Sequence, residues 1–409
     1  MTAWFLPALV LGAALAAPDP VRAAPGDIGP ERVQLSPIVE ARLRYEGVSQ
    51  GNLDADAVTL RLRAGAEARF GRFSLLAELE TTVAPGNDYN AFAFPGPPER
   101  QRRPQFAVVA DPENAELNRL QLQYRFREGA ITLGRQRINM DDQRWVGAVG
   151  WRQNEQTFDA IRAEARLGPV GVDLAYATSQ RTVFGTDAGV RSALGGQFLL
   201  ANLSARIGPV QGRLFAYLLD YDEDFFLANS SQTFGGAISG SFPLGGGIML
   251  NLRASHARQR DLGRNPFNYS AAYWALEGSS GIAGFTLTAG WERLGSDNGH
   301  AVQTPMATLH KFNGWADLFL VTPPAGLDDS YVSIARRFDG VRPFPGLTAS
   351  LGWHRFDSAT GNIPYGSEWD TSLGFHLGPF SVLLKYADFD ARRFGTDTRK
   401  VWLQLEWAR

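Results

Sequence analysis

The segment from Leu117 to Phe126 alternates apolar and polar residues, which few folds can accommodate. One face of such a strand carries Leu120, Leu122, Tyr124 and Phe126, and the other carries Arg119, Gln121, Gln123, Arg125 and Arg127. The apolar face needs a core or lipid, and the guanidinium groups opposite need water or acidic partners. The sequence therefore predicts a strand that separates two different environments.

The same period of two recurs along the chain, at 40–46, 60–70, 161–167 and 401–407. No long segment has an apolar stripe with the 3.6-residue period of a helix. After residue 23, no apolar run reaches the roughly 18 residues that a membrane-spanning helix requires. The pattern predicts an all-β protein.

Short turns and longer polar connections alternate between these strands. Short turns are predicted at 71–72, 128–129, 168–169, 208–209, 244–247, 280–284, 343–346 and 378–379, and longer loops at 47–55, 84–116, 139–156, 180–196, 220–232, 258–267, 295–326, 357–367 and 389–398. If the chain begins and ends on the short-turn side, eight short turns and nine long loops both imply 18 strands. The sequence thus predicts a transmembrane up-and-down antiparallel β-barrel of about 18 strands, each of ~9–11 residues. The alternative is a large soluble β-protein with one solvated face.

The first 23 residues resemble an export signal. An apolar run from Ala3 to Ala17 precedes Val21-Arg22-Ala23, a small-residue cleavage site. We therefore expect a signal peptide at 1–23, a barrel domain at 24–409 and insertion into a Gram-negative outer membrane by the barrel-assembly machinery. The alternative is a buried first helix.

Composition excludes several classes of function. The 40 basic and 42 acidic residues nearly balance, so no nucleic acid partner is expected. The chain has no cysteine, which excludes zinc–thiolate sites and thiol catalysis. Its five histidines form no HExxH or similar ligand spacing. No cofactor, metal site or catalytic residue is predicted.

Arginines dominate the polar faces of the first strands. Since a barrel of ~18 strands is wide enough for an aqueous channel, these faces would line it, and rings of arginine favour anions. The predicted anion-binding residues are Arg42, Arg44, Arg61, Arg63, Arg119, Arg125, Arg135, Arg137, Arg144, Arg152 and Arg162. Strand residues Arg213 and Arg253 also face the expected lumen. The alternative is that these arginines pair with glutamates across strands and only build the wall.

The connection from Gly295 to Gly326 is long and carries aromatic residues that a fully solvated loop would not favour. We expect it to fold into the lumen as a constriction loop, with His310, Lys311, Asn313, Trp315 and Asp317 as its functional residues. The alternative is a loop that packs outside the mouth.

Three segments carry a family resemblance. Arg42–Glu46, Gly134–Ala160 and Thr304–Asp329 resemble segments of the alginate-export family of Gram-negative outer-membrane porins. The resemblance implies an 18-stranded barrel with an arginine-lined, electropositive channel that passes an acidic polysaccharide or other solutes.

The sequence therefore favours a channel for anionic saccharides or other carboxylate solutes. A general or small-anion nutrient porin is the alternative. A barrel enzyme or an adhesin is less favoured, because no set of Ser, His and acid shares a strand pair and the outer loops are of ordinary length.

Overall fold

The computed structural model describes residues 33–408, in which 18 strands form one closed antiparallel sheet. The predicted signal peptide lies outside the described residues. The barrel strands are β1 (Gln34–Gln50), β2 (Leu53–Phe70), β3 (Phe73–Asp88), β4 (Asn114–Phe126), β5 (Gly129–Gln136), β6 (Thr157–Leu167), β7 (Val170–Arg181), β8 (Ala193–Ile207), β9 (Val210–Tyr221), β10 (Ser231–Gly245), β11 (Ile248–Asp261), β12 (Ser270–Ile282), β13 (Phe285–Leu294), β16 (Leu327–Arg337), β17 (Thr348–Asp357), β18 (Pro364–Leu377), β19 (Phe380–Ala391) and β20 (Thr398–Ala408). The connections hold a small hairpin, β14 (Ser296–Asp297) and β15 (His300–Ala301), and three 3₁₀ helices, η1 (Thr186–Arg191), η2 (Leu227–Asn229) and η3 (Leu309–Lys311).

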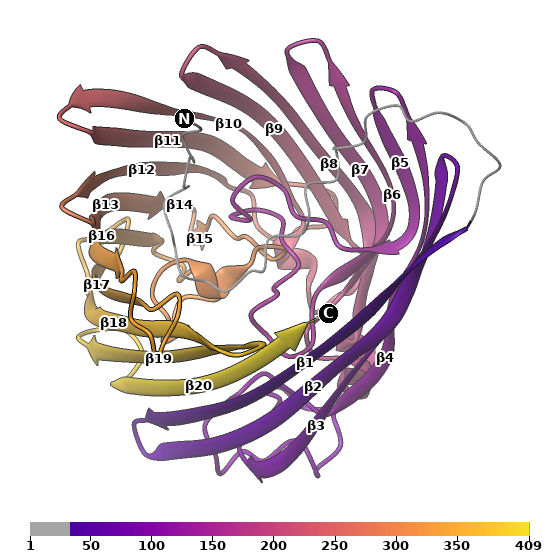
Figure 1. The fold of residues 1–409 in the computed structure, drawn as a ribbon. Helices are drawn as coiled ribbons and strands as arrows, with labels where there is room; N and C mark the ends of the chain where they lie inside the picture. The colour runs from indigo at the N-terminus through magenta and orange to yellow at the C-terminus, as the bar shows by residue number, and fades with distance from the viewer. Residues whose placement is uncertain (1–32, 409) are drawn as a thin grey trace.

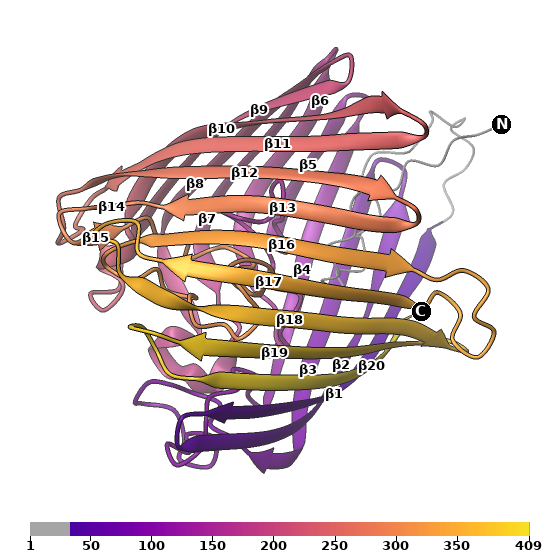
Figure 2. The same ribbon diagram turned by 90° about the vertical axis from the view of Figure 1, so that its left-hand side faces the viewer.

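The barrel closes between its first and last strands. β1 pairs with β20 in a register that runs from Glu40 opposite Ala408 to Gln50 opposite Thr398. Every other strand pairs with its neighbours in chain order, so no sheet edge is left to pair with another chain. Figure 1 shows the closed ring of strands, and Figure 2 shows the strands tilted across the barrel.

The alternation of faces decides which side chains point outward. Leu120 and Leu122 on β4 are 45% and 42% exposed on the outside, whereas Arg119, which precedes them, is largely buried on the inside. Exposed aliphatic and aromatic side chains recur on the outside of all the barrel strands. This outer belt is the surface that a lipid bilayer covers, and it makes the sheet a transmembrane barrel. None of the helices in residues 33–408 is long and apolar enough to cross a membrane.

The predicted strand number is confirmed, and two connections differ from expectation. The loop expected at 47–55 is a two-residue turn at 51–52, because Gly51 adopts a φ of 60° and the polar flanks continue β1 and β2. The turn expected at 343–346 lies within a ten-residue connection, 338–347. Several strands also exceed the expected length. β2 has 18 residues, so it extends beyond the apolar band.

Candidate functional site

Two connections from the long-loop end fold into the barrel and join there. They are residues 137–156 between β5 and β6 and residues 295–326 between β13 and β16, together called the plug below. The backbone N–H of Gly147 donates to the Met306 carbonyl at 2.8 Å, and that of Thr308 donates to the Gln143 carbonyl at 3.1 Å. Figure 1 shows both connections crossing the interior. The 295–326 connection therefore folds into the lumen, as the sequence indicated.

The plug spans the lumen from one wall to the opposite one. On β7, Gln180 Nε2 donates to the Pro305 carbonyl at 3.0 Å. On β18, Glu368 Oε1 accepts the backbone N–H of Ala316 at 2.7 Å. Eight strands lie between β7 and β18 in both directions around the ring, so these contacts are diametrically opposed.

The arginines of β1 and β2 hold the plug against the wall. Arg42 donates to the carbonyls of Gly150, Trp151 and Arg152 and pairs with Glu406 on β20 at 2.9 Å. Arg44 donates to the Trp151 carbonyl at 2.6 Å, and its guanidinium lies 4.1 Å from the centre of the Trp151 ring. These guanidinium groups face the lumen, as alternation predicts, but the 150–152 segment covers them.

The neighbouring charges form a buried network. Arg61 pairs with Glu40 and Glu406, and Arg63 pairs with Glu40, Glu80 and Glu155. The side chains of Arg42, Arg44, Arg61 and Arg63 are each at most 5% exposed. In this arrangement they cannot meet a passing solute, and they serve the wall and the plug instead.

Glu155 is the acid of the plug that joins this network. Burial alone would raise its pKa, but Arg137, Arg63 and Arg119 outweigh burial and lower the pKa to about 2. Arg137 Nε donates to Glu155 Oε1 at 2.5 Å, and Arg119 pairs with Glu78 at 2.5 Å. The ionised carboxylate therefore fixes the end of the 137–156 connection to β2 and β3.

Four other predicted arginines lie in three different places. Arg144 is buried in the plug, where it pairs with Glu292 at 2.7 Å. Arg125 and Arg162 face the lumen beside acidic partners, Glu67 for the first and Glu164 and Asp173 for the second. Arg135 lies on the outer face, since it is opposite Leu120 in register, and it pairs with Asp159 at 2.8 Å. Arg135 therefore does not line the channel.

A second cluster fastens the 295–326 connection to the wall. Arg152 of one plug connection pairs with Asp317 of the other at 2.8 Å. The His310 Nδ1–H donates to Asp317 Oδ1 at 2.8 Å, and the Lys385 ammonium of β19 donates to His310 Nε2 at 2.7 Å. The same ammonium lies 3.6 Å from the centre of the Trp315 ring and 4.2 Å from that of Trp151.

The charge states of this cluster follow from its burial. Burial lowers the pKa of His310 to about 3, so its imidazole is neutral at neutral pH. Burial would raise the pKa of Asp317, but His310, Lys400 and Arg152 hold it well below its usual range. An anionic Asp317 bound by a neutral histidine and by cations therefore joins both plug connections to the barrel.

The other predicted constriction residues, Lys311 and Asn313, also hold the plug. Lys311 Nζ donates to the Asp142 carbonyl at 2.8 Å, and Asn313 Nδ2 donates to Glu292 Oε2 at 2.7 Å. The five residues predicted for this loop thus lie together inside the barrel.

Open space remains in the lumen at the short-turn end, beneath the plug. One cavity of about 350 Å³ is lined by residues that include Glu164, Arg166, Asp173 and Arg213. Another of about 240 Å³ is lined by residues that include Arg253, Glu277, Lys311 and Tyr331. Both lie along β6–β9 and β11–β18, away from the buried network of β1 and β2, and charged side chains line part of each.

The plug meets the wall at Asp141 and Asp142, which lie where the two cavities adjoin. Asp141 pairs with Arg213 of β9 and with Arg253 of β11, the latter at 2.5 Å, and Asp142 lies 3.1 Å from Arg253. The Arg213 and Arg253 side chains are 20% and 27% exposed, so water reaches both guanidinium groups. The alternation placed both arginines on the lumen side. The Asp-Asp pair lies in the loop predicted at 139–156, without a local signal that it reaches β9 and β11.

Comparisons with known proteins agree with this architecture. The model of the alginate export family matches residues 40–182. OpdK of Pseudomonas aeruginosa has a TM-score of 0.71 at 16% identity over 92% of this chain and 98% of its own, and a structure of OpdK with vanillate has a TM-score of 0.70 at 16% identity over the same shares. OccAB4 of Acinetobacter baumannii has a TM-score of 0.69 at 11% identity, over 92% of this chain and 98% of its own. No curated protein sequence matches the chain.

The closed barrel, its lipid-facing belt and these matches define an outer-membrane porin of the Gram-negative type, a channel through which solutes cross. Over residues 40–182 the chain carries the sequence pattern of the alginate export family. This range contains Arg42–Glu46 and Gly134–Ala160, so the resemblance of these segments is confirmed. The third segment, Thr304–Asp329, lies beyond the matched range.

Proposed function

We propose that this porin passes anionic solutes, either acidic saccharides or small carboxylates, along the β6–β13 side of its lumen. The supporting observation is the contact of the plug residues Asp141 and Asp142 with the barrel wall. There, two partly exposed guanidinium groups, those of Arg213 and Arg253, share the carboxylates of Asp141 and Asp142. An anion that displaces Asp141 would find two cations that remain accessible to water.

The approach to this contact from the short-turn end is also basic. Arg166 and Arg206 face the lumen on β6 and β8 and are exposed. Arg162 lies nearby, but Glu164 and Asp173 balance its charge. The path thus has a basic entrance and a constriction at which two arginines face two aspartates. In this proposal the solute contacts these residues, whose charges are less fully balanced, and not the buried arginines of β1 and β2.

Two solute classes fit this chemistry. A saccharide chain of uronate units matches the family pattern, whereas a small aromatic carboxylate matches the neighbour whose structure contains vanillate. We favour the broader class, carboxylate-bearing solutes, since Arg213 and Arg253 recognise the carboxylate itself. We propose a passive channel and no catalytic function.

Replacing Arg213 and Arg253 together by glutamine should reduce anion selectivity several-fold or reverse it. The substitutions leave Asp141 and Asp142 uncompensated at the constriction, and a ring of net negative charge favours cations. The measurement is the reversal potential of single channels in planar bilayers under a salt gradient.

The matched control removes negative charge, where the first variant removes positive charge, from the same contact. Asp141→Asn with Asp142→Asn should increase anion selectivity, because it frees both guanidinium groups without changing side-chain size. If both double variants keep the wild-type reversal potential, the solute path lies elsewhere. A clear cation preference in the wild type would reject the proposed function itself.

A further inference from the structure

We propose that the outer face of β11 and β12 binds the phosphate group of an anionic, phosphorylated lipid in the outer leaflet. Arg258 and Arg260 lie two residues apart on the outward face of β11, and both side chains are exposed. Their Nε atoms donate to the same acceptor, Ser270 Oγ on β12, at 2.8 and 3.2 Å. Two guanidinium groups therefore converge on one neutral hydroxyl.

This arrangement differs from that of other outward arginines near the long-loop end. Arg293 pairs with Asp328, Arg355 with Asp357 and Arg399 with Asp388. Among residues 33–408, no carboxylate oxygen lies within 4.0 Å of a nitrogen of Arg258 or Arg260. The nearby acids are engaged elsewhere, since Asp297 accepts the Ser270 N–H and Asp261 accepts the Tyr269 N–H.

Two adjacent like charges without a counter-ion are costly unless an anion lies between them. The Nη groups of both arginines keep their donors available, and a guanidinium binds phosphate oxygens through two parallel hydrogen bonds. The site therefore offers a bidentate contact from each arginine to one phosphate group.

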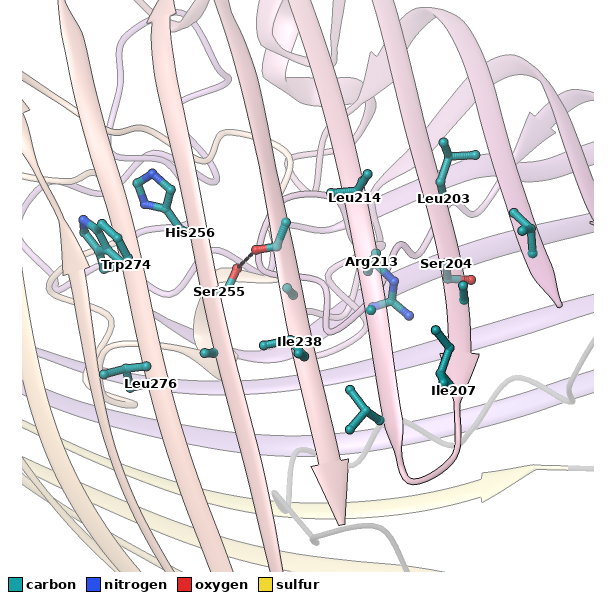
Figure 3. Close-up of a pocket in the computed structure, with 17 residues that line it drawn as sticks. Leu203, Ser204, Ile207, Arg213, Leu214, Ile238, Ser255, His256, Trp274 and Leu276 are labelled. Carbon is teal, nitrogen blue, oxygen red and sulfur yellow. Dashed lines mark hydrogen bonds between the residues drawn. The ribbon is translucent and has the colours of Figure 1, made fainter. Parts of the chain in front are cut away.

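An apolar groove continues from this pair toward the short-turn end. His256 lies two residues from Arg258 on the same outward face, and its ring packs on the exposed Trp274 with centroids 3.9 Å apart. On the short-turn side of these two rings, the outer face of the barrel has a groove of about 660 Å³. Its lining residues include Leu214, Ile238 and Leu276. Figure 3 shows these side chains around the groove, across strands β8–β12.

The groove exists because its floor is built from small residues. Gly212, Gly236 and Ala254 occupy outward positions where other strands carry leucine or valine. The position of the arginines identifies the leaflet, because outer-membrane barrels keep their short turns in the periplasm and their long loops outside. A phosphate at Arg258 and Arg260 would lie at the outer border of the apolar belt, and an attached acyl chain would enter the groove. The arginine pair and the apolar groove adjoin on one face of the barrel. This favours a lipid, which has both a phosphate group and acyl chains, over free phosphate or a second copy of the barrel.

The test compares lipid binding by the folded barrel in micelles of an uncharged detergent, read by native mass spectrometry. The probe is diphosphorylated lipid A, with its dephosphorylated form, its deacylated sugar phosphate and inorganic phosphate as comparisons. The wild type should retain diphosphorylated lipid A at least about tenfold more tightly than any of the other three. Arg258→Gln with Arg260→Gln should remove this preference.

Arg399→Gln is the matched control, because Arg399 is exposed on the outer face near the same end but pairs with Asp388. It should bind diphosphorylated lipid A like the wild type, and heat-modifiable gel mobility shows that each variant is a folded barrel. Equal retention by the wild type and the Arg258/Arg260 variant, or an equal loss in the control, would overturn the proposal. Tight binding of inorganic phosphate alone would reject the lipid, and a changed oligomeric state without altered lipid retention would identify a second copy instead.

Discussion

Excision of residues 304–321 is expected to raise the single-channel conductance several-fold. These residues form the part of the plug that crosses to β18 and β19, so their removal opens the lumen on that side. The structure offers a natural place for the cut, because Gln303 and Thr322 are hydrogen-bonded to each other. The Gln303 Oε1 accepts the Thr322 N–H at 3.1 Å, and Gln303 Nε2 donates to the Thr322 carbonyl at 2.9 Å. A Gly-Gly link between Gln303 and Thr322 should preserve these two hydrogen bonds.

The excision should also lower thermal stability without preventing barrel assembly. Arg152 loses Asp317 but keeps Glu46, whereas Lys400 of β20 loses Asp317, its one carboxylate partner within 4.0 Å among residues 33–408. A buried charge left without its partner costs roughly 3–5 kcal/mol. The strand ladder itself is unchanged, so heat-modifiable mobility should persist. Shortening the exposed 392–397 connection is the control, and it should leave conductance unaltered. An excised protein with wild-type conductance would show that the plug does not limit flow.

Acidification is expected to loosen the plug in two overlapping pH ranges. When the plug is released, His310 regains its ordinary pKa of 6.5, while in the docked plug its pKa is about 3. The released form therefore binds the proton more readily, so docking weakens as the pH falls below 6.5 and stops weakening near 3. Each pH unit in this range removes about 1.4 kcal/mol of docking free energy. Above pH 6.5, His310 contributes no pH dependence.

Glu155 adds a second range at lower pH. Its pKa is about 2 in the docked plug and 4.5 when free, so its stabilising effect is complete above pH 4.5 and declines as the pH falls toward 2. Single-channel recordings between pH 7 and pH 3 should show larger or more frequent openings as the pH decreases. The change should begin near pH 6.5.

His310→Gln separates the two ranges. A glutamine can donate to Asp317 and accept from Lys385, and it does not titrate. The variant should keep a closed plug at pH 5 and open only as Glu155 becomes protonated below pH 4.5. If the wild type and the variant open at the same pH, His310 does not control docking.

The period of two was the most informative part of the sequence because it acts locally. Adjacent residues of a strand must point to opposite faces, so Leu120 and Leu122 belong outside and Arg119 inside in any register. Together with the turns, this predicted 18 strands. The same rule places Arg135 outside, since it follows Ile131 and Leu133 at intervals of two, although its charge suggested a channel role.

Non-local contacts decided everything about the site. Nothing near Arg42 or Arg63 in the sequence shows that residues 150–155 will cover them, because that contact joins segments about 100 residues apart. Nor does the Asp141-Asp142 pair show locally that it will meet β9 and β11. The sequence by itself determined the barrel, its lipid face and the presence of an inward loop, since these follow from local alternation and turn chemistry. Only the tertiary structure decided which lumen-side arginines stay accessible to water, because a guanidinium is accessible only where the fold brings no carboxylate or loop to cover it.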